Sequence, residues 1–325
     1  MMKFSSMVST LLAACVMGGL VQAQMTLNLG YSLSPDSHYG AGAQAFAQEI
    51  DRLSEGRIHI VEQPANALGG EREMVEGLQI GSVDMVITST GPVGNFVPEI
   101  LVLDLPFLFR DYEHARGVLD GEIGQELLES FPERGIVALA WTENGFRHLT
   151  NNQRAVRTPE DLQGLKIRTM ENQVHIRAFQ AAGAAPTPMA FPELFTALQQ
   201  GTVDGQENPI PGITSANFQE VQRYLSLTGH VYSPALVLIS PSVWDRLSEE
   251  EQGWFREAAK ASVEATRNKV TEVEQEGIEA LRAAGMDVTT DIDIEPFQAA
   301  VAPAYEDFTR QYGDELLERI RNYGE

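Results

Sequence analysis

The alternation of apolar and polar positions along the chain predicts strands and helices that follow one another. Short stretches near the start alternate with the period of two that is typical of strands, and longer stretches repeat apolar residues at helical spacing. The predicted elements are, in order, a strand over residues 26–31, a turn over 34–37, a helix over 38–53, a strand over 57–61, a helix over 71–80 closed by Gly81, and a buried strand over 83–88. This order predicts a parallel sheet with helices packed on its faces.

The same pattern returns in the second half of the chain. The predicted elements there are a strand over residues 165–168, helices over 174–182 and 191–200, and a strand from Val203. Residues 77–84 (GLQIGSVD) also resemble residues 197–204 (ALQQGTVD), and in both a helix ends at a glycine before a strand begins. Either this is chance similarity within a common turn, or two lobes follow one plan. We expect two lobes, each with its own small sheet and with a ligand cleft between them.

A single long helix is predicted in the last third of the chain. Helix-forming residues run without proline from Ser248 to about residue 284, where Gly285 ends the helix. At 1.5 Å per residue it is roughly 50 Å long, which exceeds the needs of one lobe. Its apolar residues do not keep the strict heptad of a coiled coil. We therefore expect it to cross between the two lobes.

The first 23 residues have the features of a secretory signal peptide. Lys3 precedes a mostly apolar stretch, and Val21-Gln22-Ala23 offers a small-residue cleavage site before Gln24. A lipidated N-terminus at Cys15, or an uncleaved anchor, are the alternatives. No later stretch has the 18–20 continuous apolar residues of a membrane span. The sequence therefore predicts an exported, periplasmic protein that is soluble once processed.

Composition and charge exclude several classes of partner. The chain of 325 residues carries 46 Asp+Glu against 23 Lys+Arg, a formal net charge of −23. Nucleic acid and anionic lipid surfaces attract basic patches, so neither is an expected partner. The one Cys excludes a disulfide framework and a cysteine-based zinc site.

Motifs for catalysis, cofactors and metals are missing. There is no nucleophile elbow, phosphate-binding loop or zinc-protease helix motif. Residues 40–45 match a dinucleotide-binding pattern, but they lie inside a predicted helix and not in the strand-to-helix turn that this pattern requires. Glu171 and His175 have the spacing of two metal ligands, although a surface contact explains that pair better. We expect no metal, no cofactor and no enzymatic activity.

Two arginines are the candidates for binding an anion. Arg168 ends a predicted strand, where its side chain would project into the cleft, and Arg147 lies at the first crossover between the lobes. In a protein this acidic, an anionic ligand needs fixed local cations, and a guanidinium matches a carboxylate with two parallel hydrogen bonds.

Five segments in order and spacing resemble the substrate-binding proteins of TRAP (tripartite ATP-independent periplasmic) transporters. They are residues 68–73 (LGGERE), 103–107 (LDLPF), 164–168 (GLKIR), 186–191 (PTPMAF) and 203–209 (VDGQENP). The resemblance implies a two-lobed α/β periplasmic-binding-protein fold, an interlobe ligand cleft and a long helix spanning both lobes. We place the first lobe over residues 24–145 plus about 233–272, and the second over 146–232 plus about 273–325.

The resemblance also implies roles for individual residues. Arg168 matches the family arginine that pairs with the ligand carboxylate, and Arg147 matches a second, supporting arginine. Asn208 matches an asparagine that bonds near the carboxylate, and Phe191 matches an aromatic residue that packs on the ligand.

Further candidates lie on the opposite lobe or in its first loop. Glu71 and Ser89 fall where family members recognise the rest of the ligand, and Ser32 and His38 are looser candidates. Glu171 occupies a position that varies in the family; a carboxylate there would favour ligand hydroxyls over a second carboxylate.

The expected function follows from this set of groups. We predict a monomer that captures an organic acid by closing its lobes and delivers it to an integral-membrane permease. A hexuronate such as glucuronate or galacturonate is the first choice. C4-dicarboxylates, 2-oxo or hydroxy acids, aromatic acids and sialic acid are the alternatives. An exported glycosidase using Glu71 and Glu171, or a partner of a sensory receptor, are the competing function classes.

Overall fold

The computed structural model describes residues 24–324, so the predicted signal peptide and Cys15 lie outside the described residues. The strands are β1 (Met25–Tyr31), β2 (Ile58–Gln63), β3 (Met85–Ser89), β4 (Val137–Asn151), β5 (Lys166–Thr169), β6 (Ala185–Pro188), β7 (Gly205–Pro209), β8 (Tyr224–Ile239) and β9 (Asp287–Thr289). The α-helices are α1 (His38–Leu53), α2 (Glu71–Ile80), α3 (Thr90–Val93), α4 (Tyr112–Asp120), α5 (Glu122–Glu129), α6 (Gln173–Ala181), α7 (Phe191–Gln199), α8 (Ile210–Ser215), α9 (Pro241–Trp244), α10 (Glu249–Ala283), α11 (Ile294–Ala300), α12 (Ala302–Tyr312) and α13 (Glu315–Arg321). Short 3-10 helices are η1 (Pro98–Asp104), η2 (Pro132–Arg134), η3 (Pro159–Leu162) and η4 (Phe218–Glu220).

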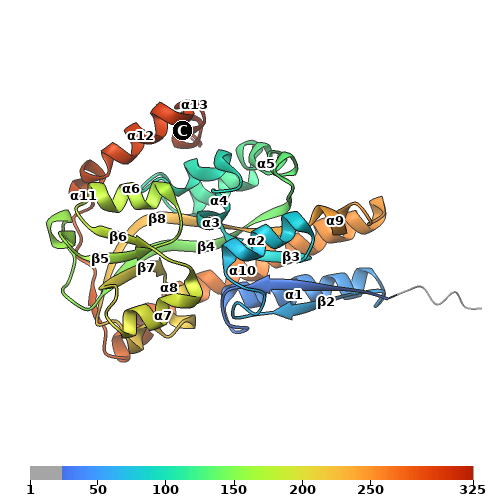
Figure 1. Ribbon diagram of the computed structural model, residues 1–325, viewed down its shortest axis with the longest axis horizontal. Coiled ribbons are helices and arrows are strands. Elements are labelled where there is room, and N and C mark those ends of the chain that lie inside the picture. Colours follow the sequence, from blue (N-terminus) through green and yellow to red (C-terminus); the bar gives the residue numbers. More distant parts are fainter. Residues whose placement is uncertain (1–23, 325) are drawn as a thin grey trace, which may run out of the picture.

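Two βαβαβ units lie at opposite ends of one sheet (Figure 1). The first unit is β1-α1-β2-α2-β3, with strands in the order β2-β1-β3, and the second unit is β5-α6-β6-α7-β7, with strands in the order β6-β5-β7. Strands within each unit are parallel. These units confirm the alternating pattern predicted from the sequence.

The expectation of two separate small sheets is wrong, because two long strands join the units. β4 and β8 pair antiparallel along most of their length. β8 also pairs with β3 of the first unit, and β4 pairs with β7 of the second. The result is one continuous path of strands, β2-β1-β3-β8-β4-β7-β5-β6, with β9 paired to β8.

Local signals set the ends of the helices that lead toward the cavity. The side chain of Ser37 accepts a hydrogen bond from the backbone N of Gly40 and begins α1. Gly81, with φ of 76°, ends α2 in the left-handed conformation that glycine adopts without strain. Gly201, after α7, has φ of 69°, so the two similar segments found in the sequence share their turn geometry.

The long helix α10 extends along both halves of the molecule (Figure 1). It packs against α1 of the first unit and against α8, which follows the second unit. The C-terminal helices form another connection, since α12 packs on α6 whereas Arg319 of α13 pairs with Glu126 of α5. The predicted lobe boundaries stay a prediction.

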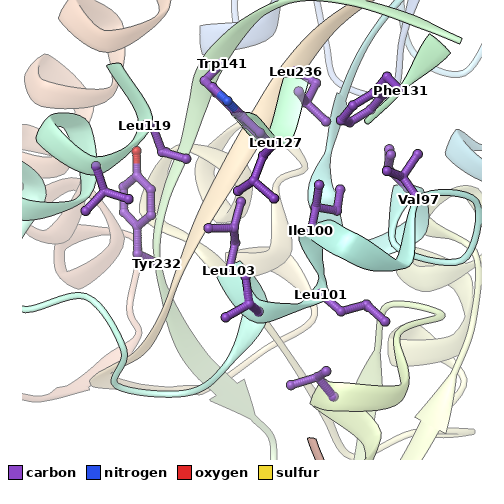
Figure 2. Close-up of a cluster of buried hydrophobic side chains, with 14 of the residues drawn as sticks. Val97, Ile100, Leu101, Leu103, Leu119, Leu127, Phe131, Trp141, Tyr232 and Leu236 are labelled. Atoms are coloured by element: carbon purple, nitrogen blue, oxygen red, sulfur yellow. The ribbon is translucent and has the colours of Figure 1, made fainter. Parts of the chain in front are cut away.

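A large apolar cluster supports β4 and β8 on the side of the first unit (Figure 2). It joins η1, α4 and α5 to the two long strands, and its labelled residues are Val97, Ile100, Leu101, Leu103, Leu119, Leu127, Phe131, Trp141, Tyr232 and Leu236. Full burial of such a side chain contributes about 1.5–3 kcal/mol. The cluster therefore fixes the strands from which the central site residues project.

Over residues 24–324, no helix has the length and apolar character needed to cross a membrane.

Candidate ligand-binding site

A polar cavity lies where the two units meet, at the carboxyl ends of their strands. It continues outward into a wider groove, with which it shares Glu71, Arg168, Met170 and Phe191. The cavity is lined by Ser32, Leu33, Tyr39, Glu71, Ser89, Asn144, Arg168, Met170, Phe191, Asn208 and Gly212. Five predicted site residues (Glu71, Ser89, Arg168, Phe191 and Asn208) are thus brought together, and so is the looser candidate Ser32.

The guanidinium of Arg168 lines this cavity, and only part of its hydrogen-bonding capacity is used by the described residues. Its side chain projects from β5, is 2% exposed, and donates from Nε to the carbonyl oxygen of Met189 at 2.9 Å. Its Nη1 is buried without a hydrogen-bond partner among residues 24–324. Burial lowers the pKa of Arg168 to about 10, so the group remains cationic at neutral pH. A buried cation with an unused donor is costly unless an anion binds to it.

Arg147 is also buried, but the protein itself supplies its anion. Its Nη2 donates to Oε1 of Glu207 at 2.8 Å and its Nε donates to Oε2 at 2.5 Å. Burial lowers the pKa of Arg147, but the Glu207 carboxylate outweighs this effect and raises it above its usual value. Burial raises the pKa of Glu207, but Arg147 and His230 hold it well below its usual range.

This ion pair lies behind the cavity wall and positions Asn208. Arg147 Nη2 donates to Asn208 Oδ1 at 3.3 Å, and Asn208 Nδ2 donates to Gln206 Oε1 at 2.6 Å. Arg147 is not among the residues that line the cavity. Its geometry fits a supporting group better than a direct partner of the ligand.

Glu71 supplies a carboxylate on the side of the first unit. As the first residue of α2, it accepts hydrogen bonds at Oε1 from Thr88 Oγ1 at 2.8 Å and from Ser89 Oγ at 3.3 Å. These donors hold the carboxylate in place within the cavity wall. A fixed carboxylate can accept hydrogen bonds from ligand hydroxyls.

Phe191 adds an apolar surface on the side of the second unit. It is the first residue of α7 and packs edge-on against Phe218, with ring centroids 6.0 Å apart. The guanidinium of Arg168 lies 5.9 Å from the centroid of the Phe191 ring. The second unit therefore presents a cation beside an aromatic ring.

Like Arg147, two further predicted site residues lie away from the cavity lining. His38 is completely buried behind Asn144 as the first residue of α1, and its Nε2 lies 2.9 Å from Asn144 Oδ1. Glu171 lies in the outer groove, where its carboxylate is 3.9 Å from Nη1 of Arg72. Its backbone oxygen accepts a hydrogen bond from Asn95 Nδ2 at 2.6 Å.

Sequence reasoning did not select Tyr39, Asn144 or Met170 as lining residues. The sulfur of Met170 lies 3.3 Å from Ser89 Oγ, as an alternative acceptor to Glu71 for the one hydroxyl hydrogen, and this contact links the two sides of the cavity. Asn144 had a detectable signal, because an Asn-Gly pair interrupts a strand otherwise rich in apolar residues.

Within residues 24–324, no group of His, Cys, Asp or Glu side chains is arranged to hold a metal ion.

The fold and the cavity define a class of protein. Two α/β units that enclose a polar cavity at their strand ends, beneath a helix spanning both, have the architecture of a two-lobed ligand-binding protein. The sequence model of the bacterial extracellular solute-binding proteins, family 7 (DctP), matches residues 29–311. The chain belongs to this family, and it is a binding protein and not an enzyme.

A sequence relative and two solved structures support the assignment. A solute-binding protein of Verminephrobacter eiseniae is 51% identical over 92% of this chain and 90% of its own length. A TRAP periplasmic solute-binding protein of Polaromonas, solved with D-erythronate, is 53% identical with a TM-score of 0.92. One from Bordetella bronchiseptica, with density assigned to pantoate, is 55% identical with a TM-score of 0.91. Each comparison covers 93% of this chain and all of the solved chain.

A more distant structure has a different ligand. A TRAP periplasmic solute-binding protein of Chromohalobacter salexigens, solved with D-glucuronate, is 30% identical over 91% of this chain and 99% of its own, with a TM-score of 0.88. These neighbours share the two-lobed fold, which confirms the predicted fold class and the TRAP resemblance.

Proposed function

We propose that the protein binds a short, open-chain hydroxy monocarboxylate and delivers it to a TRAP-type membrane permease. The observation that carries the proposal is the buried Nη1 of Arg168 in the wall of the cavity, which has no partner among residues 24–324. The ligand carboxylate binds there, because a cation without an internal anion is stabilised by a carboxylate. Arg147 and Asn208 support that end of the ligand.

The rest of the ligand lies against the first unit. Glu71 accepts hydrogen bonds from ligand hydroxyls, with Ser89 and Ser32 beside it in the cavity wall. Phe191 packs on the carbon chain. A second ligand carboxylate next to Glu71 would be repelled, so the arrangement favours hydroxyls over a dicarboxylate.

The expected size of the ligand follows from the relatives. Erythronate and pantoate both have a four-carbon chain with one carboxylate and hydroxyl groups, and the structures that contain them are 53% and 55% identical to this chain. The hexuronates predicted from the sequence are the second candidate, favoured by the glucuronate complex at 30% identity.

Binding and delivery proceed by closure of the two halves around the acid. Closure places the ion pair between carboxylate and Arg168 in a drier site, where the attraction is stronger. We propose that the protein acts as a monomer in the periplasm after removal of residues 1–23, with lobes divided as predicted from the sequence.

A thermal-shift screen of residues 24–325 tests this function. The compounds are D-erythronate, pantoate, galacturonate, glucuronate, succinate and the neutral alcohol erythritol. A ligand at 100 times its dissociation constant stabilises the protein by about 2.7 kcal/mol. We expect a shift with D-erythronate or pantoate and none with erythritol, which has the hydroxyls of erythronate but lacks the carboxylate. A shift with hexuronates alone would favour the second candidate. No shift with any acid, in protein refolded to remove carried-over ligand, would overturn the proposal.

A further inference from the structure

Asn144 is turned toward the cavity by an irregularity in the central sheet. Along the β4–β8 pair, Glu143 lies opposite Pro234 and Gly145 lies opposite Ser233, so Asn144 is the extra residue of a β-bulge. Gly145 has φ of 115°, a conformation that a residue with a side chain rarely adopts. Bulges re-aim side chains beside binding sites, and Asn144 is 5% exposed and lines the cavity.

His38 fixes the orientation of the Asn144 amide. Its Nε2 lies 2.9 Å from Oδ1 of Asn144. An amide oxygen only accepts hydrogen bonds, so the Nε2 of His38 carries the proton. Burial lowers the pKa of His38 to about 4, and the ring is therefore neutral at physiological pH. Because Oδ1 is engaged, the Nδ2 donor is the end of the amide that remains available to a ligand.

We propose that Asn144 donates from Nδ2 to a hydroxyl oxygen of the bound acid, and that His38 is the positioning residue that holds Asn144 in place. The inference rests on the proposed function and deepens it. Glu71 accepts from ligand hydroxyls whereas Asn144 donates to one, so together they match the donor and acceptor character of a hydroxyl. An acid that lacks this hydroxyl leaves the amide unpaired and binds less tightly.

The contact with Asn144 also explains why a polar side chain, His38, occupies a completely buried position. Among residues 24–324, the side chain of His38 hydrogen-bonds to Asn144 through Nε2, while its Nδ1 is buried without a partner. If this position only filled space in the core, an apolar side chain would be more stable there than an imidazole with an unpaired nitrogen. The retained imidazole is accounted for by the donor that it offers to Asn144.

A double-mutant cycle tests the pair. Affinities for D-erythronate and for its single-deoxy analogues, 2,4- and 3,4-dihydroxybutanoate, are measured by calorimetry for wild type, Asn144→Ala, His38→Leu and the double variant. We expect Asn144→Ala to weaken erythronate binding about 10-fold and to reduce the preference over one deoxy analogue toward equality. His38→Leu should have a similar effect alone and none in the Asn144→Ala background, because a positioning residue acts only through its partner.

Two conservative variants keep the test decisive if an apolar substitution impairs folding. Asn144→Asp retains the acceptor for His38 but removes the donor, and should weaken binding at least 10-fold. His38→Gln retains a donor and should preserve most of the affinity and the preference. Independent effects of His38→Leu and Asn144→Ala, or an unchanged preference in Asn144→Asp, would overturn the pairing while leaving the proposed function intact. Wild-type protein that binds none of the acids would overturn both.

Discussion

The two βαβαβ units are built alike but carry different chemistry at the cavity. In the first, Leu29 of β1 lies opposite Met85 of β3. In the second, Ile167 of β5 lies opposite Gly205 of β7. Each unit also has an aspartate that accepts a hydrogen bond from the backbone N of its central strand at 2.8 Å: Asp84 from Asn28, and Asp204 from Lys166.

Matching the units in this register identifies where they differ. Arg168 corresponds to Gly30, and Phe191, the first residue of α7, corresponds to Glu71, the first residue of α2. The second unit thus offers a cation and an aromatic ring where the first offers a glycine and a carboxylate. In the proposed function, the second unit therefore binds the carboxylate of the ligand and the first unit binds its hydroxyls.

The largest loss of stability is expected from removing the ion pair between Arg147 of β4 and Glu207 of β7, which joins the second unit to β4. Arg147→Met leaves Glu207 buried without its main partner and should lower the free energy of unfolding by about 3–5 kcal/mol. Urea unfolding measures this change. The double variant Arg147→Met/Glu207→Leu should recover part of the loss. A wild-type unfolding free energy in the single variant would show that the pair contributes nothing.

The shared plan predicts equal effects at the two aspartates. Asp84→Ala and Asp204→Ala each remove a charged acceptor from a backbone N–H of the central strand, and should each cost about 1–3 kcal/mol in unfolding free energy. Neither should change ligand affinity by more than about threefold, since neither residue lines the cavity. A large loss at one position and none at the other would break the equivalence of the units.

A buried histidine near the start of α6 predicts a pH dependence of stability. Burial lowers the pKa of His175 from its ordinary 6.5 to about 3. The unfolded chain therefore takes up a proton below pH 6.5 that the folded protein rejects, and stability is lost as pH falls. His175→Gln should reduce the loss between pH 7.5 and 5 by about 2 kcal/mol. Chemical unfolding at both pH values measures it, and an unchanged pH dependence would contradict this origin.

The smallest effect is expected at the rim of the outer groove. The side chain of Glu171 is 34% exposed, and its carboxylate is 3.9 Å from Arg72 in the first unit. Such partly exposed pairs contribute about 0–1 kcal/mol. Glu171→Gln should change the affinity for a hydroxy acid by no more than about threefold, measured by calorimetry. A tenfold change would place Glu171 among the groups that recognise the ligand.

Local signals in the sequence were sufficient for much of the fold. The predicted helix over residues 38–53 and the one over 71–80 have the bounds observed for α1 and α2, because Ser37 and Gly81 set them through neighbouring backbone groups. The continuous sheet could not be predicted in this way. Strands β4 and β8 were not among the predicted elements, because their mutual pairing joins residues about 75–100 positions apart.

In the candidate site too, some residues could be identified from the sequence, whereas contacts that depend on strand pairing could not. The predicted strand end indicated Arg168, and the family resemblance indicated Glu71 and Phe191; all three line one cavity. The partner of Arg147 was not foreseeable, since Glu207 reaches it only through the pairing of β4 with β7. The bulge that turns Asn144 toward the cavity likewise depends on the register of β4 against β8.

The central claim is that Nη1 of Arg168, which has no partner among residues 24–324, receives the ligand carboxylate. Calorimetric titration of D-erythronate into wild type, Arg168→Lys and Arg168→Ala tests it most directly. Loss of a buried, charge-assisted pair predicts at least about a 100-fold weaker affinity for Arg168→Ala, roughly 3 kcal/mol, with Arg168→Lys intermediate because its planar pair of donors is lost. Binding of D-erythronate by Arg168→Ala with wild-type affinity would contradict the account.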